Sequence, residues 1–258
     1  GAVELISSRI SNLMQEYTLT NIDDLANELF ERSKTAMQEA IHKLPEGLYQ
    51  YSMQTDGFNE RFNFCVAIFS LISANLIFSF IGFSNADMVD KTIMWPYRVK
   101  REKQYFRFIT SGFLHADFMH LFFNMFTLYF FGKNLEIMFS IYGLGGNLSY
   151  LLLYFLALIV SDIPSYLKHK DDYNYRSLGA SGAVAAVIFA TIVFSPWSSI
   201  YIYAAIKISA AVYAVLYIAY CVYMGKKNAD NVNHDAHLWG SLFSLAFTLV
   251  LVGILQPQ

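Results

Sequence analysis

The sequence has little charge for its length. Only 15% of its 258 residues are Asp, Glu, Lys or Arg, whereas soluble domains carry roughly 25%. Hydrophobic residues account for 55% and aromatic residues for 17%, so the composition indicates a protein that faces lipid. The net charge of −2 and the lack of a basic tract argue against a nucleic-acid partner.

Cysteine is equally scarce. The chain has two, Cys65 and Cys221, which lie far apart inside apolar stretches and form no CxxC pair. We therefore expect buried core residues, neither a disulfide framework nor a metal site. No basic segment leads into an apolar run near residue 1, so the start of the sequence does not resemble a signal peptide.

Residues 1–61 differ in composition from the rest and are expected to form a soluble, mostly helical segment. Thr20 or Asn21 can cap a helix, and Pro45 marks a stop. The stretches RISNLMQEY, ERSKTAMQEAI and LPEGLYQY resemble an internal segment of the hydantoinase B / oxoprolinase family. That resemblance brings no complete site, and we interpret residues 1–61 as a fused fragment.

Residues 62–256 contain six apolar runs, which predict an all-α membrane domain with six spanning helices. The first run, 64–83, is uncharged and would span about 30 Å as a helix. The other five cover 118–132, 146–160, 179–194, 200–224 and 237–255.

Lys207 lies well inside the fifth run. A lysine buried in a membrane is a candidate functional residue. The alternative, which we favour, is that the fifth span begins near Lys207 and the long side chain reaches the interface.

Few polar residues interrupt the runs, and they lie on three of them. They are His120 and Asn124 in the second run, Ser181 at the start of the fourth, and His234, Asp235 and His237 at the start of the sixth. Each alone is compatible with an ordinary hydrogen bond between membrane helices. Together they offer a nucleophile, a base and donors for an oxyanion.

Ser181 needs a base, because a serine alkoxide does not form unaided at neutral pH, and the neutral imidazole of His237 suits that task. Small residues would let the two helix starts touch. They are Gly179 and Gly182 beside the serine and Gly240 three residues after the histidine.

The tetrahedral intermediate needs hydrogen-bond donors. The Ser181 backbone N–H would lie at a helix N-terminus, which carries partial positive charge. His120 and Asn124 are four residues apart, so they share a helix face and are the expected side-chain donors.

The motifs GASG at 179–182, HLFFN at 120–124 and AHLWG at 236–240 resemble the rhomboid family of intramembrane serine proteases. The resemblance runs from about residue 62 to 256. It places Arg107 at the family's Trp-Arg position and Glu136 at its acidic position after the second helix, both as structural residues.

The resemblance implies a Ser-His dyad without a third acid, with Ser181 as nucleophile and His237 as base. His120, Asn124 and the Ser181 N–H would form the oxyanion hole. It also implies a metal-free reaction without a cofactor, on single-pass transmembrane substrates in a lipid bilayer. We expect a multi-pass protein of a plasma membrane such as the bacterial inner membrane.

Two positions depart from the family pattern. Many rhomboids have a tyrosine one turn after the serine, where this chain has Ala185, so we expect Trp239 or Tyr175 to orient His237. Ser244 replaces a family glycine on the last span, which would loosen the contact between that span and its neighbour.

Three other functions fit the sequence less well. A rhomboid-like protein that only binds membrane helices would usually lack the serine or the histidine. A metal enzyme could use His234, His237 and Asp235, with His120 or His115 as a further ligand, but the chain has no HExxH motif. A transporter would show internal symmetry, which the sequence does not have.

The charge pattern and the family disagree about sidedness. The loop 84–115 contains six Lys and Arg residues if Arg107 is included, so the positive-inside rule places it in the cytoplasm. The family implies a cytoplasmic N-terminus and places that loop outside. We follow the family, because a structured loop at the interface need not obey a rule made for short flexible ones.

Overall fold

The computed structural model describes residues 65–202, 206–227, 230 and 232–255. The chain divides between Asp56 and Gly57, and the predicted soluble segment 1–61 lies outside the described residues. The part of the chain that is described is helical apart from one short hairpin, in agreement with the all-α membrane fold expected from the sequence.

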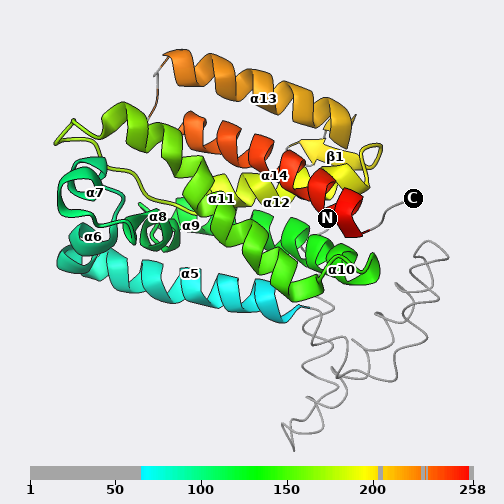
Figure 1. The fold of residues 1–258 in the computed structure, drawn as a ribbon, viewed down its shortest axis with the longest axis horizontal. Helices are drawn as coiled ribbons and strands as arrows, with labels where there is room; N and C mark the ends of the chain where they lie inside the picture. Colours follow the sequence, from blue (N-terminus) through cyan, green and yellow to red (C-terminus); the bar gives the residue numbers. More distant parts are fainter. Residues whose placement is uncertain (1–64, 203–205, 228–229, 231, 256–258) are drawn as a thin grey trace, which may run out of the picture. The chain divides into compact units, whose positions relative to one another are not determined.

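Six helical segments of the described chain run along the bundle (Figure 1). They are α5 (Val66–Ser84), α9 (Phe118–Thr127) continued by the π-helical turn η2 (Leu128–Gly132) and α10 (Lys133–Ile141), α11 (Gly146–His169), α12 (Ser181–Phe194), α13 (Ala210–Lys227) and α14 (His234–Leu255). Three of them, α5, α11 and α14, are long and apolar enough to cross a membrane, and α12 is a shorter apolar helix.

Helix α12 lies at the centre and packs against α11 and α14 (Figure 1). All nine residues from 182 to 190 are buried, and most of them are Ala, Gly or Val. A helix that is apolar on every side is stable only when neighbours surround it, and its small side chains let those neighbours approach closely. The sequence thus places the start of α12, and Ser181 with it, between other helices.

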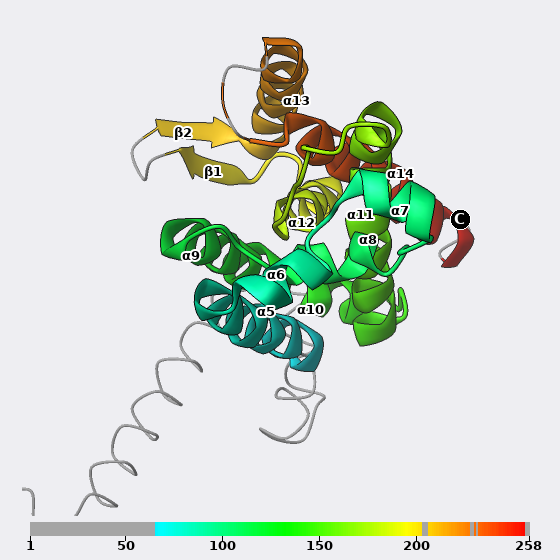
Figure 2. The ribbon, with the colours of Figure 1, turned by 90° about the vertical axis from the view of Figure 1, so that its left-hand side faces the viewer.

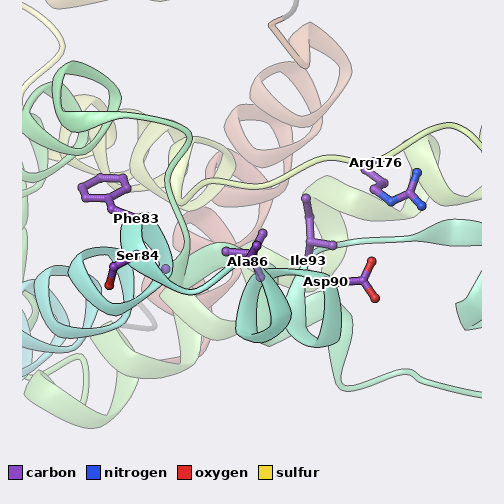
Figure 3. Close-up of a pocket in the computed structure, with 8 residues that line it drawn as sticks. Phe83, Ser84, Ala86, Asp90, Ile93 and Arg176 are labelled. Atoms are coloured by element: carbon purple, nitrogen blue, oxygen red, sulfur yellow. The ribbon is translucent and has the colours of Figure 1, made fainter.

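The connection between α5 and α9 folds into short helices at one end of the bundle (Figures 1 and 2). They are α6 (Ala86–Thr92), α7 (Pro96–Glu102), α8 (Arg107–Thr110) and the 3-10 turn η1 (Ser111–Phe113). A cavity of about 470 Å³ lies where the end of α5 meets α6, and Arg176 is one of the residues that line it (Figure 3).

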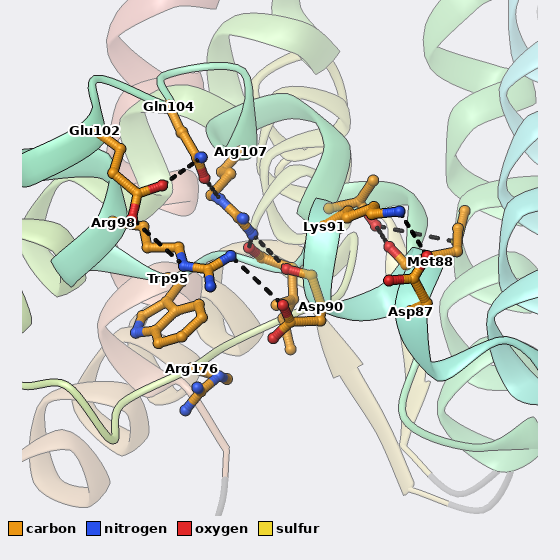
Figure 4. Close-up of polar contacts among 12 residues, drawn as sticks. Asp87, Met88, Asp90, Lys91, Trp95, Arg98, Glu102, Gln104, Arg107 and Arg176 are labelled. Atoms are coloured by element: carbon orange, nitrogen blue, oxygen red, sulfur yellow. Dashed lines mark hydrogen bonds and ion pairs between the residues drawn. The ribbon is translucent and has the colours of Figure 1, made fainter.

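Arg107 holds this connection together. Its guanidinium, which is 1% exposed, donates hydrogen bonds to the carbonyls of Asp90 and Ile93 at 2.9 and 2.6 Å and to Gln104 Oε1 at 2.6 Å (Figure 4). A buried charge needs such partners, because leaving it unpaired costs several kcal/mol or more.

Glu136 of α10 holds the other end of α5. Its two carboxylate oxygens accept hydrogen bonds from the backbone N–H groups of Ala67 and Ile68 at 3.0 and 2.9 Å. These donors have no partner within α5, and a carboxylate at a helix N-terminus also faces its positive end.

The fifth span differs from its prediction. The stretch between α12 and α13 forms a two-stranded antiparallel hairpin of β1 (Ser199–Ile202) and β2 (Ile206–Ser209), which extends from the bundle beside α13 (Figure 2). The expected helix start at residue 200 is therefore wrong, and α13 begins at Ala210. Lys207 lies in β2 and is exposed, so it precedes the helix as the favoured interpretation required.

Candidate active site

Ser181 is the first residue of α12, and the backbone before it is fixed from two sides. Ser177 forms an antiparallel bridge with Met94, with both N–H···O distances at 3.1 Å, and the Gly179 N–H donates to the Ser111 carbonyl at 3.0 Å. Both contacts come from the α5–α9 connection, which therefore positions the start of α12.

Gly179 brings Ser181 and His120 to the same point. Its φ of +125° suits glycine alone. A Cβ atom added to it would lie 2.8 Å from His120 Cε1, 3.0 Å from His120 Nε2 and 4.0 Å from Ser181 Oγ. The lack of a side chain at Gly179 therefore leaves room for the His120 imidazole close to Ser181.

The orientation of His120 suits a hydrogen-bond donor. Its Nδ1 accepts a long hydrogen bond of 3.5 Å from the Ala116 N–H. An imidazole that accepts through Nδ1 carries its proton on Nε2, which is the atom next to Gly179. Asn124, one turn later and 7% exposed, uses one of its two amide hydrogens on the His120 carbonyl at 3.1 Å. The other hydrogen is free to bind elsewhere.

His237 is in the first turn of α14, and its helix approaches α12 through glycine. A Cβ added to Gly240 would collide with the Gly182 carbonyl, so the two backbones are in direct contact there. Gly182 was expected to face α14, but the side of it that a side chain would occupy faces α11. A Cβ on it would collide with Ser161 of α11 and lie 3.3 Å from the Ala236 carbonyl. The lack of a side chain at Gly182 thus lets both α11 and α14 pack closely against α12.

One cavity of about 1090 Å³ connects these groups. Ser181, His237, His120 and Asn124 all line it. Four polar residues from α9, α12 and α14 therefore line one cavity, whose walls are both polar and apolar. A cavity of this size has ample room for water and for a short stretch of extended peptide.

Tyr217 of α13 is the residue that the sequence did not reveal. Its ring stacks on the His237 ring, with 6.4 Å between centroids and 16° between planes. The expectation that Trp239 or Tyr175 would orient His237 is wrong in the structure, because Trp239 is 46% exposed and Tyr175 stacks on His169 at 3.7 Å. Tyr217 lies in an almost uniformly apolar run, so nothing in the sequence showed which of its side chains faces α14.

The second departure has a simple structural account. Ser244 is fully buried, and its hydroxyl donates to the Ser241 carbonyl at 3.0 Å within α14. The hydroxyl thus has its hydrogen-bond partner within its own helix.

His234, Asp235 and His115 each pair with another side chain. His234 Nε2 contacts the Asp230 carboxylate at 3.0 Å, and Asp235 pairs with Lys168 at 3.7 Å. His115, in the loop before α9, hydrogen-bonds Ser79 Oγ through Nδ1 at 2.8 Å, and burial lowers its pKa to about 3. The predicted metal set of His234, His237 and Asp235, with His120 or His115 as a further ligand, is therefore not assembled among the described residues, although His234 and His237 lie close together.

Fold and site together define a multi-pass membrane protein with a cavity that polar residues of several helices line. The sequence profile of the Rhomboid domain matches residues 102–254, which is more than half of the chain. The chain belongs to the rhomboid family.

Three curated relatives agree with this assignment. RHOMBOID-like protein 12, mitochondrial, of Arabidopsis thaliana is 29% identical over 52% of this chain and 42% of its own length. A candidate rhomboid protease of Bacillus subtilis (strain 168), YdcA, is 31% identical over 57% of this chain and 68% of its own length. Rhomboid-like protein 11, chloroplastic, of Arabidopsis thaliana is 30% identical over 57% of this chain and 52% of its own length. The chain thus spans about half the length of the two plant relatives.

Proposed function

We propose that this protein is an intramembrane serine endopeptidase that cleaves transmembrane segments of other membrane proteins. The observation that carries the proposal is the single cavity lined by Ser181, His237, His120 and Asn124. Rhomboid proteins are generally serine proteases, and a relative named as a candidate rhomboid protease matches this chain.

In the proposed reaction, His237 removes the Ser181 hydroxyl proton as the oxygen attacks the substrate carbonyl carbon. The C–N bond then breaks, and His237 returns the proton to the leaving amine. Water from the cavity attacks the acyl-enzyme ester with His237 again as base, which releases the carboxylic acid and restores Ser181.

The oxyanion of each tetrahedral intermediate would be held by three donors. They are the Ser181 N–H at the start of α12, His120 Nε2–H and the second amide hydrogen of Asn124. Fixed donors stabilise the developing charge more than water does, because they need no reorientation during the reaction. The contact between Gly179 and His120 supports this role, since it holds the imidazole beside the serine.

The substrate helix must unwind locally before it can react. A helical carbonyl is already hydrogen-bonded and is covered by its own turn. We therefore expect cleavage at small or helix-destabilising residues. The membrane is also part of the proposal: we expect a plasma membrane, and the mitochondrial and chloroplastic names of two relatives make cell fractionation the direct test.

The test is cleavage of a generic single-pass transmembrane substrate by the purified protein in detergent. Ser181→Ala and His237→Ala should each lower the rate by at least about a thousandfold. Ser84→Ala removes an exposed serine at the end of α5 and should leave the rate unchanged.

Each alternative gives a distinct outcome. Cleavage that survives both dyad substitutions would remove the Ser-His mechanism, and loss of cleavage with a chelator would indicate metal catalysis. Binding of the substrate with no cleavage by the unaltered protein, and no labelling of Ser181 by a serine-reactive fluorophosphonate, would identify a helix-binding member of the family.

A further inference from the structure

Three potential metal ligands lie close together, and the proposed base His237 is one of them. One ligand atom each from Cys221 of α13 and from His234 and His237 of α14 lie within 4.8 Å of one another. Bonds of 2.0–2.3 Å from a tetrahedral ion would place such atoms about 3.3–3.6 Å apart. Closing the cluster around an ion therefore requires side-chain shifts of only about 1 Å.

His234 is already arranged as a metal ligand. It is 4% exposed, and the Asp230 carboxylate contacts its Nε2 with both oxygens, at 3.0 and 3.1 Å. A carboxylate on one ring nitrogen fixes the proton there and leaves the other nitrogen with a free lone pair, as in the carboxylate–histidine–zinc arrangement. That other nitrogen, Nδ1, is buried and has no hydrogen-bond partner in the described part of the chain.

Cys221 supplies the third ligand. It is a free thiol, 1% exposed. One sulfur and two imidazoles favour zinc and similar borderline or soft ions over magnesium or calcium, which prefer oxygen ligands. His234, His237 and Asp230 line the large cavity, so an ion has a route to the cluster from solvent.

We propose that Cys221, His234 and His237 form a binding site for a zinc-type divalent ion, and that occupancy of this site inhibits cleavage by engaging His237. Binding displaces the thiol proton to solvent and uses the lone pairs of two neutral imidazoles. An ion held by the nitrogen lone pair of His237 leaves it unable to accept the Ser181 proton. The inhibitory half rests on the proposed function, whereas the site itself does not.

Cobalt(II) is the probe for the site, because a cobalt–thiolate bond gives a charge-transfer absorption that imidazole alone does not. The full chain in detergent, stripped of metal, should bind one Co²⁺ with this band, and Zn²⁺ should displace it. Cys221→Ser should remove the band. Cys65→Ser, which alters the other buried cysteine near the start of α5, should retain it.

The result that overturns the site is a wild-type protein with no thiolate band, or a band that Cys221→Ser retains. If Cys221→Ser does not fold, His234→Asn keeps the test decisive, because loss of one imidazole should weaken Co²⁺ binding at least about tenfold and change the spectrum.

The inhibitory half is tested by zinc titration of substrate cleavage. The zinc concentration for half inhibition should rise at least tenfold in Cys221→Ser and stay unchanged in Cys65→Ser. Cobalt binding without zinc inhibition would overturn this half alone. If the metal-free protein cleaves nothing, the proposed function fails, and the cobalt spectrum still decides whether the site exists.

Discussion

At the scale of single residues, the site depends on positions where a side chain is absent. Gly179 has a left-handed φ, and its missing Cβ is the space that the His120 ring occupies. Ala185 offers no aromatic ring to support His237, and the ring of Tyr217, from another helix, stacks on His237 instead. Both arrangements make the geometry of the proposed dyad and oxyanion hole depend on exact backbone placement.

Gly179→Ala should lower cleavage at least about tenfold, because the new methyl group displaces His120 and an error of about 1 Å can cost a hundredfold in rate. Gly143→Ala is the matched control, since Gly143 also has a positive φ of 63° but no atom within 4 Å of an added Cβ. Initial rates on the transmembrane substrate measure both. Equal rates for the two variants would contradict the role of Gly179.

Tyr217→Ala should lower the cleavage rate about tenfold through loss of orientation of His237, whereas Tyr217→Phe keeps the stacked ring and should retain most activity. Tyr223→Ala, on an exposed part of the same helix, serves as the control. The pH–rate profile should shift for Tyr217→Ala alone. A Phe variant as slow as the Ala variant would show that the hydroxyl, not the ring, matters.

At the scale of elements, the crossing of α12 and α14 sets the distance between Ser181 and His237, the proposed nucleophile and base. The Gly240 Cα rests against the Gly182 carbonyl, and Gly182 in turn is fitted against Ser161. The backbones of α12 and α14 are thus in contact at this residue pair, and the Ser161 side chain of α11 packs against Gly182. Any side chain added at this crossing must separate the helices that carry Ser181 and His237.

Gly240→Ala should destabilise the protein by about 1–3 kcal/mol, the usual cost of overpacking. Gly253→Ala lies in the same helix with nothing within 4 Å of an added Cβ, and should be neutral or slightly stabilising, because Ala favours helix over Gly by about 1 kcal/mol. Thermal unfolding midpoints in detergent compare them. A destabilised Gly253→Ala with an unaffected Gly240→Ala would refute the close crossing.

The helices and strands also show which parts of the fold could be predicted from the sequence. The spans and the polar residues on them could be predicted, because hydropathy is local and a few polar groups stand out against it. The hairpin at 199–209 could not, since a short apolar run with β-branched residues reads equally as strand or helix. The facing of Tyr217 and Cys221 toward α14 could not either, because an apolar helix gives no signal of its rotation about its axis.

At the scale of the whole molecule, buried neutral histidine makes stability depend on pH. The folded pKa of His115, about 3, lies below the usual 6.5 because burial disfavours the charged ring. Between these values the unfolded chain binds more protons, so stability falls as the pH falls below 6.5. At pH 5 the loss from this residue is about 2 kcal/mol.

His115→Asn retains a polar partner for Ser79 but does not titrate in this range. Its unfolding midpoint should therefore drop less than that of the wild type between pH 7 and pH 5, although it starts lower at pH 7. The two proteins share every other titrating group, so the difference isolates His115. Parallel curves would contradict the assignment.

Removal of residues 1–61 should leave the cleavage rate and the unfolding midpoint of the membrane domain unchanged, if this segment is a fused fragment. Both are measured on the shortened chain in the same detergent. A loss of activity at an unchanged midpoint would instead assign residues 1–61 a functional role.

The segment Ser177–Gly179 is pinned at both ends, to Met94 and to Ser111. Its length is therefore as constrained as its composition. One residue inserted between the two pins and Ser181 would turn the helix start by about 100° and direct the hydroxyl away from His237. Across related chains, insertions and deletions should therefore be absent between these contacts and the serine, and Gly179 should stay glycine because of its φ of +125°.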